Sequence, residues 1–274
     1  MSELNDLAAV AARMRGTLVE LSHNRSTAHL GGCLSCVDIL VALYWRAVKI
    51  SPERANDPDR DRLIMSKGHA AMSIYASLAM RGFFDEEELW TMHTPGSRLP
   101  EQPSPGSVPG LEAATGSLGH GLPIGVGQAI AARVQHRDYR VFVVMSDGEC
   151  EEGSVWEATM FAGARKLERL MAVVDYNKWQ ATGRSQKVMA LDPLPGKFEA
   201  CGWSTYRVDG HDLDALVEVL TKLPDGSGKP VAVIADTVKG KGVSFMEDDN
   251  NWHYRIPTED EVEAAHRELG LVRT

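Results

Sequence analysis

The sequence predicts an α/β fold with a doubly wound, mostly parallel sheet and helices on both of its faces. Short apolar runs bounded by polar residues indicate buried strands, and they occur at residues 62–66, 143–146, 173–176 and 230–236. The second and third runs are separated by one helical length of chain, as in a parallel βαβ unit. The 274 residues, of which 43% are hydrophobic, supply ample material for a core, and we assign a single domain, 1–274.

Helices are expected where apolar residues recur at helical spacing and where capping residues precede them. Residues 94–110 carry five prolines and three glycines, which indicates an irregular loop that is functional or mobile. Residues 115–127 are glycine-rich and lead into a helix. The expected helices are residues 4–22, 33–40, 70–80 and 126–135, one beginning near Glu152, a short one around Phe198, one capped by Asp212, and a charged one over 259–269.

Charge and apolar pattern argue against several classes of protein. A formal net charge of −9 does not suit a general nucleic-acid or anionic-membrane binder. No apolar run reaches membrane-spanning length, and the first residues lack the pattern of a signal sequence, so we expect a cytoplasmic protein. Cys33 and Cys36 have the spacing of a metal or redox pair. Because there is no second pair and the segment is apolar with helical spacing, we interpret them as buried structural thiols.

Polar residues end two of the predicted strands. Asp147-Gly148 follows the run at 143–146, and Asn177 follows the run at 173–176. In an open parallel sheet ligands bind where the strands end, so both side chains are expected at the binding edge. A helix starting near Glu152 would aim its N-terminus at the same place, which suits a phosphate. A carboxylate, an amide oxygen and phosphates together describe a Mg²⁺ site, although Asp-Gly alone occurs in many βαβ units.

This arrangement resembles the thiamine diphosphate signature, in which Gly-Asp-Gly is followed about thirty residues later by Asn. The segments Ser66-Lys67-Gly68-His69-Ala70 and Thr115-Gly116-Ser117-Leu118-Gly119-His120-Gly121 are similar to those of the transketolase family. The whole chain resembles the N-terminal half of a transketolase, in the short form split over two polypeptides. Two positions differ from the signature, since Ser146 replaces the first Gly and Lys178 replaces the usual second Asn.

The resemblance implies two cofactors, thiamine diphosphate and Mg²⁺, held by the fold typical of the pyrophosphate-binding domain of transketolases. The implied metal ligands are Asp147, Asn177 and the backbone carbonyl of Trp179. The implied cofactor-binding residues are His69, Gly116, Ser117, Leu118, Asp147, Gly148, Glu149, Asn177, Lys239 and His253. Lys239 belongs to a Lys-Gly-Lys-Gly turn that either holds phosphate or is simply solvated.

The resemblance also implies catalytic residues. His29, His69 and His253 correspond to histidines of the reacting centre. Glu152, and with it Glu157, corresponds to glutamates between cofactor sites, although acidic residues in a first helical turn also occur for the helix dipole alone. We assign His211, which follows another strand, a structural role.

The glutamate that activates thiamine diphosphate lies in a pyrimidine-binding domain in this family. We therefore expect the partner to be a separately encoded C-terminal transketolase subunit, in an α2β2 heterotetramer acting on sugars, with no nucleic acid or membrane. Two alternatives stay open. One is an α-type subunit of a 2-oxo acid dehydrogenase or of a pyruvate-using acyl-transfer enzyme, and the other is a non-catalytic thiamine diphosphate binder. Gln102 stands where the family usually has a donor-binding His, so we expect an unusual donor, such as a modified ketose or pyruvate.

Overall fold

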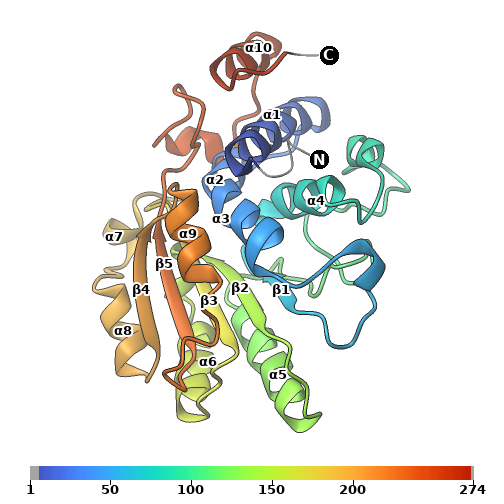
Figure 1. Cartoon of the computed structure of the whole chain (residues 1–274). Coiled ribbons are helices and arrows are strands. Elements are labelled where there is room, and N and C mark those ends of the chain that lie inside the picture. Colours follow the sequence, from blue (N-terminus) through green and yellow to red (C-terminus); the bar gives the residue numbers. More distant parts are fainter. Residues whose placement is uncertain (1–5, 273–274) are drawn as a thin grey trace.

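The computed structural model describes residues 6–272 and contains one five-stranded sheet with helices on both faces (Figure 1). All four strand pairings are parallel, and the strand order is β1-β2-β3-β5-β4. The doubly wound architecture predicted from the sequence is therefore confirmed. The strands are β1 (Arg62–Met65), β2 (Val141–Ser146), β3 (Leu170–Tyr176), β4 (Ser204–Asp209) and β5 (Val231–Asp236).

The helices divide between the two faces of the sheet. One face is covered by α1 (Leu7–Arg25), α2 (Leu30–Ser35), α3 (Val37–Ala42), α4 (Ala71–Met80) and α9 (Leu213–Leu220), with α10 (Glu259–Glu268) packed on α1. The other face is covered by α5 (Gly121–Val134), α6 (Gly153–Ala164) and α8 (Leu194–Ala200). A short helix, α7 (Ser185–Val188), follows β3.

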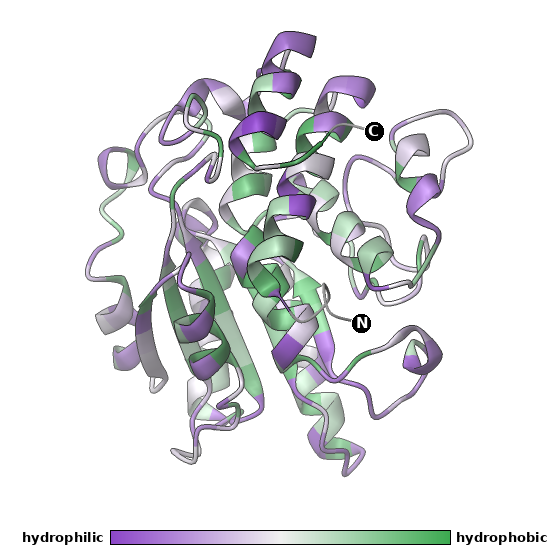
Figure 2. Ribbon diagram, turned by 45° about the horizontal axis from the view of Figure 1, so that its top comes forward, coloured by the Kyte–Doolittle hydropathy of each residue, from purple (hydrophilic) through white to green (hydrophobic). Residues whose placement is uncertain are grey.

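The strands contribute to two hydrophobic clusters because successive side chains point to opposite faces of a sheet. Val144 and Val173 belong to the cluster with α1–α4 and α9, whereas Val143 and Val174 belong to the cluster with α5, α6 and α8. Figure 2 shows the central strands as a hydrophobic band. β2 and β3 are buried along their whole length. This rigid centre fixes the positions of the residues that follow both strands.

The structure changes the predicted start of one helix. α5 begins at Gly121, five residues before the predicted start at 126, so the glycine-rich segment is partly helical. A Cβ atom on Gly125 would lie 2.6 Å from Val143 Cγ2. The glycine therefore lets α5 approach β2 closely, and it does not mark a loop. The first predicted helix is α1, and positions 4 and 5 of that prediction lie outside the described residues.

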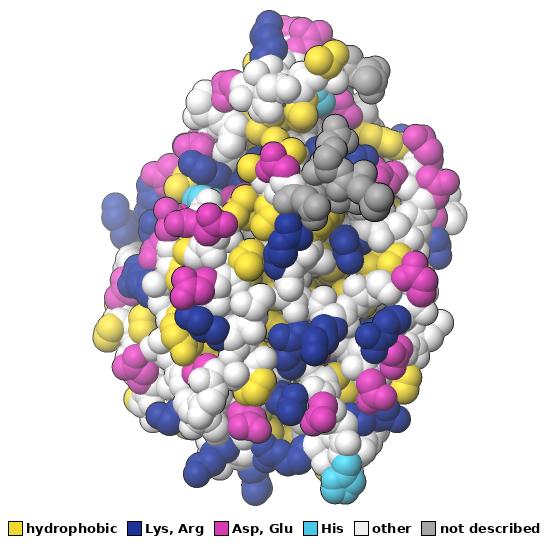
Figure 3. All heavy atoms as spheres, in the orientation of Figure 1, with side chains coloured by type: hydrophobic (Ala, Val, Ile, Leu, Met, Phe, Trp, Pro, Cys, Tyr) yellow, Lys and Arg dark blue, Asp and Glu magenta, His cyan; other side chains and the backbone are white. Residues whose placement is uncertain are grey.

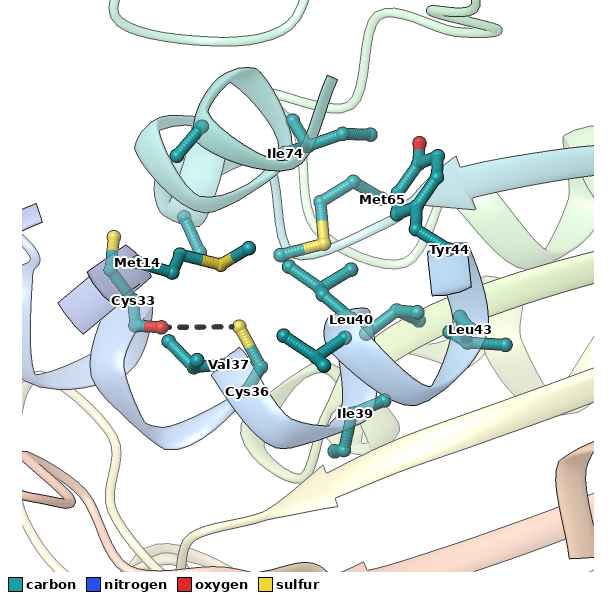
Figure 4. Packing of buried hydrophobic residues seen from close by; sticks show 14 of the residues in the cluster. Met14, Cys33, Cys36, Val37, Ile39, Leu40, Leu43, Tyr44, Met65 and Ile74 are labelled. Atoms are coloured by element: carbon teal, nitrogen blue, oxygen red, sulfur yellow. Dashed lines mark hydrogen bonds between the residues drawn. The ribbon is translucent and has the colours of Figure 1, made fainter. Parts of the chain in front are cut away.

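The paired cysteines are structural, as predicted. Cys33 within α2 and Cys36 directly after it are free, buried thiols, and the Cys36 Sγ donates to the Cys33 carbonyl at 3.4 Å (Figure 4). Burial raises the pKa of Cys33 to about 12 and that of Cys36 to about 11. Both thiols thus stay protonated and unreactive at neutral pH.

The surface is charged and mixed. Acidic, basic and apolar side chains are interspersed over the face shown in Figure 3. Within residues 6–272 no helix is both long enough and apolar enough to span a membrane.

Candidate active site

A cavity of about 380 Å³ opens at the carboxyl edge of the sheet, where β1, β2, β3 and β5 end. It combines residues from several segments that are far apart in the sequence. The lining residues are His29, Gly32, His69, Gln102, Gly116, Leu118, Ser146, Gly148, Glu151, Glu152, Asn177, Trp179, Gln180, Ala181, Thr182, Lys239 and His253. Most of these were predicted as site residues, and Gln102 was predicted to contact the donor substrate.

Three predicted histidines gather at one side of this cavity. The ring centroid of His29 lies 5.4 Å from that of His69 and 4.9 Å from that of His253. His29 adopts a left-handed backbone conformation with φ 68°, and its N–H donates to the His253 carbonyl at 2.8 Å. A non-glycine residue in that region costs about 1–3 kcal/mol and is often found at functional sites. The hydrogen bond to His253 holds His29 in this conformation.

Lys239 lies next to the histidines. Its Nζ is 2.7 Å from Asn250 Oδ1 and 3.0 Å from His253 Nδ1. An ammonium group can only donate, so Nδ1 accepts and the ring proton of His253 is on Nε2. The Gly31 side of α2 packs on the Lys239 stem, because a Cβ on Gly31 would lie 3.0 Å from Lys239 Cγ. Gly31 thus permits a close approach between α2 and the Lys239 side chain.

The side of the cavity formed by His29, His69, His253 and Lys239 is a buried corner, and its electrostatics favour uncharged imidazoles. Burial, reinforced by the positive charge of Lys239, lowers the pKa of His253 to about 3. Burial and the charge of Lys67 lower the pKa of His69 well below its ordinary value, and burial also lowers that of His29. Burial, with Lys67 nearby, lowers the pKa of Lys239 to about 8. At neutral pH the corner therefore presents neutral rings beside one ammonium group.

The predicted metal ligands lie together at the ends of β2 and β3. The Asp147 carboxylate accepts from Lys178 N at 2.8 Å and from Ser185 Oγ at 2.8 Å. The Asn177 Oδ1 accepts from Trp179 N at 3.0 Å. Lys178 has φ 69°, and this turn brings its N–H to Asp147. Asp147 is fully buried and does not line the cavity, while Asn177 and Trp179 do.

Two other predicted cofactor-binding residues also lie outside the lining. Glu149 is fully buried, and its carboxylate accepts from the Ser66 hydroxyl and from Gly119 N at 2.9 Å. Glu149 therefore connects the glycine-rich loop to the end of β1 through hydrogen bonds, without lining the cavity itself. Ser117 is an exposed residue of that loop. Their contact with a cofactor stays a prediction.

The residues present fit a cofactor that carries a cation and a diphosphate. Burial raises the pKa of Asp147 to about 6, and none of the ion pairs within residues 6–272 includes this carboxylate. A buried carboxylate without a cationic partner is unfavourable unless a cation joins it. His29 Nδ1 is likewise buried without a hydrogen-bond partner among these residues. The Asp147 carboxylate is thus suited to bind a cation, and His29 Nδ1 is suited to a hydrogen bond with a bound cofactor or substrate.

Sequence reasoning missed part of the site. Gln180, Ala181 and Thr182 line the cavity after the signature, and nothing in their residue types signals a site. It also missed a fully buried ion pair between Lys67 and Asp175. A lysine directly after an apolar strand, and an aspartate inside another, were the available signals.

The fold and the site define a thiamine diphosphate-binding α/β domain. Residues 8–273 match the family described as transketolase, thiamine diphosphate binding domain. The chain belongs to this family, and thiamine diphosphate is its cofactor. The family assignment decides against the α subunit of a 2-oxo acid dehydrogenase.

Relatives match along nearly the whole chain. It is 40% identical over 264 residues to the 6-deoxy-6-sulfo-D-fructose transketolase subunit of Clostridium sp., covering 96% of each. It is 37% identical over 267 residues to an apulose-4-phosphate transketolase subunit of Phocaeicola vulgatus, covering 97% of this chain and 95% of that one. Transketolase from Leishmania mexicana has a similar structure, with a TM-score of 0.90 and 26% identity, over 97% of this chain. This chain spans 41% of that solved transketolase.

Proposed function

We propose that this chain is the cofactor-binding subunit of a two-chain transketolase, which transfers a two-carbon ketol unit from a ketose to an aldose in the cytoplasm. The observation that supports this most directly is the convergence of three neutral histidines and Lys239 on the cavity that Asn177 also lines. A protein that merely bound the cofactor would not need three imidazoles of lowered pKa there. Thiamine diphosphate, when bound, supplies the electron sink that allows a carbon–carbon bond to be broken and re-formed.

In this proposal Asp147, the Asn177 amide oxygen and the Trp179 carbonyl hold Mg²⁺. These are oxygen ligands, which Mg²⁺ prefers. Lys239 lines the cavity and contacts His253, so its ammonium group is suited to an anionic group of cofactor or substrate. The remaining proposed cofactor contacts are Gly116, Ser117, Leu118, Gly148, Glu149, His69 and His253.

The histidines hold and move protons on the substrate. His253 keeps its proton on Nε2 because Lys239 donates to Nδ1, so it offers a hydrogen-bond donor to a substrate oxygen. His29 Nδ1 has no partner within residues 6–272 and is available to a hydroxyl group. Neutral imidazoles can both donate and accept, which suits proton transfer to and from a sugar hydroxyl.

A second chain completes the site in this proposal. α6 begins beside the cavity, where Glu152 lines it, and α6 carries the exposed apolar side chains Met160 (55% exposed) and Phe161 (43% exposed). Val134 of the adjacent α5 is also exposed. We propose that the pyrimidine-domain subunit covers this α5–α6 face, with Glu152 and Glu157 at the contact, in an α2β2 heterotetramer. Three relatives of similar length are named as one subunit of a transketolase, which supports a separate partner.

The donor sugar is proposed to be a modified ketose. Gln102 lines the cavity, and a Cβ on Gly116 would lie 1.8 Å from its Oε1, so the glycine is required for this packing. A glutamine at the substrate side of the cavity has different hydrogen-bonding from an imidazole. The names of the relatives, which specify a sulfonated fructose and apulose 4-phosphate, support a donor outside the ordinary ketose phosphates.

Ketol transfer measured with the chain alone, with a separately encoded pyrimidine-domain chain alone, and with both tests this proposal. Activity is expected only from the combination. Activity of the rigorously purified single chain would contradict the two-chain arrangement. Cofactor binding by the combination without any ketol transfer to a panel of aldoses would favour the non-catalytic alternative.

A further inference from the structure

The ion pair between Lys67 and Asp175 adjoins the cavity. Both side chains are completely buried, and Lys67 Nζ also donates at 2.7 Å to the carbonyl of Gly32, which lines the cavity. A buried ion pair is costly to desolvate, and it contributes little to stability compared with an apolar pair of similar size. Asp175 lies two residues before Asn177 in the sequence, which indicates that the ion pair helps to organise the site.

The Asp175 carboxylate is held in place by several hydrogen bonds. Its carboxylate accepts from four different side chains, which come from four different segments of the chain. On Oδ2 the donors are the Lys67 ammonium, the Ser35 hydroxyl at 2.6 Å and the Asn177 amide at 3.4 Å, and on Oδ1 the donor is the Thr237 hydroxyl. Asp175 is fully buried and does not line the cavity, so it stands outside the proposed set of metal ligands.

These contacts decide how the Asn177 amide is turned. Its Nδ2 donates to Ser35 Oγ at 3.2 Å as well as to Asp175 Oδ2. An ionised carboxylate can only accept, so the NH2 end of the amide must face Asp175. The Oδ1 end is therefore on the opposite side, where it accepts from Trp179 N at 3.0 Å. That side is also where the Asp147 carboxylate contacts the same turn through Lys178 N.

We propose that Asp175 and Ser35 are positioning residues that fix the Asn177 amide with its oxygen toward the bound metal, and that Lys67 holds the Asp175 carboxylate in place through the buried ion pair. The inference rests on the proposed function, because Asn177 is a metal ligand only in that proposal. Partners of this kind, one contact removed from the metal, typically change metal affinity by about 10–100-fold when mutated. The Asn177 amide oxygen is then already oriented for coordination before the metal binds.

Two substitutions form a matched pair for the test. Ser35→Ala and Thr237→Val each remove one hydroxyl that donates to Asp175, but only Ser35 contacts Asn177. Mn²⁺ binding to the full-length chain in the presence of thiamine diphosphate is measured by electron paramagnetic resonance. We expect Ser35→Ala to weaken Mn²⁺ binding about 10-fold. Thr237→Val should change it by less than about 2-fold, since that contact lies on the other carboxylate oxygen.

A third variant probes the orientation itself. Asp175→Asn keeps the shape but can present an NH2 group to Asn177, so the Asn177 amide loses the carboxylate contact that orients its NH2 end and keeps the one from Trp179 N. Because Mg²⁺ demands stricter geometry than Ca²⁺, we expect the ratio of Mg²⁺ to Ca²⁺ affinity to fall in Asp175→Asn. Thermal unfolding of each variant reports general loss of structure, which would weaken both ions alike.

The outcomes separate this inference from the proposed function. Unchanged Mn²⁺ binding in Asn177→Ala, or no binding by the wild-type chain, overturns the proposed metal site itself. Weaker binding in Asn177→Ala together with unchanged binding and unchanged ion preference in Ser35→Ala and Asp175→Asn overturns the positioning role alone. Equal losses in Ser35→Ala and Thr237→Val would also overturn it, because they would show a general effect of the buried network.

Discussion

Lys239 Nζ lies 3.0 Å from His253 Nδ1, and this contact connects a lysine that lines the cavity to one of the histidines that line it. The two groups share one buried corner, so each affects the charge of the other. Lys239 contributes to keeping the pKa of His253 at about 3, and burial brings the pKa of Lys239 itself to about 8. The ammonium is thus charged at neutral pH and loses its charge within a range that experiments can reach.

The first prediction concerns the pH dependence of cofactor binding. Lys239 is charged below pH about 8 and neutral above it. Between the pKa of Asp147, about 6, and that pH, the affinity of the chain for thiamine diphosphate with Mg²⁺ should therefore be constant. Above it the affinity should fall by up to about 10-fold per pH unit, since one proton is then taken up on binding. Calorimetric titrations on either side of this pKa measure the dependence.

Two variants of the same position provide the controls. Lys239→Arg keeps the charge over the whole range and should remove the break near the Lys239 pKa. Lys239→Met should bind more weakly and without a break. A break that persists in Lys239→Met would assign the titration to a different group.

The second prediction concerns the metal. Asp147→Ala should abolish Mg²⁺-dependent binding of thiamine diphosphate, because the buried carboxylate is the charged ligand of the proposed site. Asn177→Ala should weaken binding by about 100-fold or more, beyond the loss typical of residues that act through a ligand. Calorimetry with and without Mg²⁺ checks both. Asp138→Ala makes the same chemical change in a well-exposed loop outside the cavity and should have no effect.

Local sequence patterns were sufficient to predict the sheet and its polar exits. β2 and β3 are continuous buried runs, so their ends could be located from hydrophobicity, and with them Asp147 and Asn177. The cap of α9 was also predictable, since Asp212 accepts from Asp214 N and Ala215 N within its own turn. Such features depend on neighbours in the sequence. They can be predicted without knowledge of any tertiary contact.

The parts that sequence reasoning missed depend on distant partners. Lys67 and Asp175 are 108 positions apart, and Glu149 and Ser66 are 83 apart. Both pairs form only when the parallel strands align, and no local pattern identifies which buried charge meets which. The early start of α5 was missed for a related reason. Gly125 packs closely against β2, and from the sequence alone such a glycine cannot be distinguished from a glycine of a loop.

The third prediction concerns the proposed partner surface. Phe161→Asp on α6 should weaken association with the pyrimidine-domain chain at least about 30-fold, because a charge would replace an exposed apolar side chain of the proposed contact face. The folded chain should tolerate it, since Phe161 is exposed. Val188→Asp changes a similarly exposed apolar residue on α7, and association should be retained. Sedimentation of the two mixed chains measures the complex, and equal losses in both variants would contradict the assignment of the face.

The last prediction concerns the donor sugar, which we expect Gln102 to select. The residue lies in the irregular loop of residues 94–110 and lines the cavity together with His29 and His69. Its amide can donate and accept hydrogen bonds but cannot carry the positive charge of an imidazolium. A donor oxygen that needs a charged or imidazole partner is then left poorly paired, which costs about 1–3 kcal/mol. Xylulose 5-phosphate should accordingly be a poor donor for the assembled enzyme.

Gln102→His should raise kcat/KM for xylulose 5-phosphate by about 5- to 150-fold, the equivalent of that energy, and lower it for the modified ketose that the enzyme uses. Gln102→Ala is the matched control, because it removes the amide without supplying an imidazole and should impair both donors. The measurement is kcat/KM for xylulose 5-phosphate, a sulfonated ketose, a branched ketose phosphate and pyruvate with each variant. The reversal of preference is the informative result, since a change in stability or assembly would move all donors together. A wild-type enzyme that prefers xylulose 5-phosphate, and whose preference Gln102→His leaves unaltered, would exclude Gln102 as the residue that selects the donor.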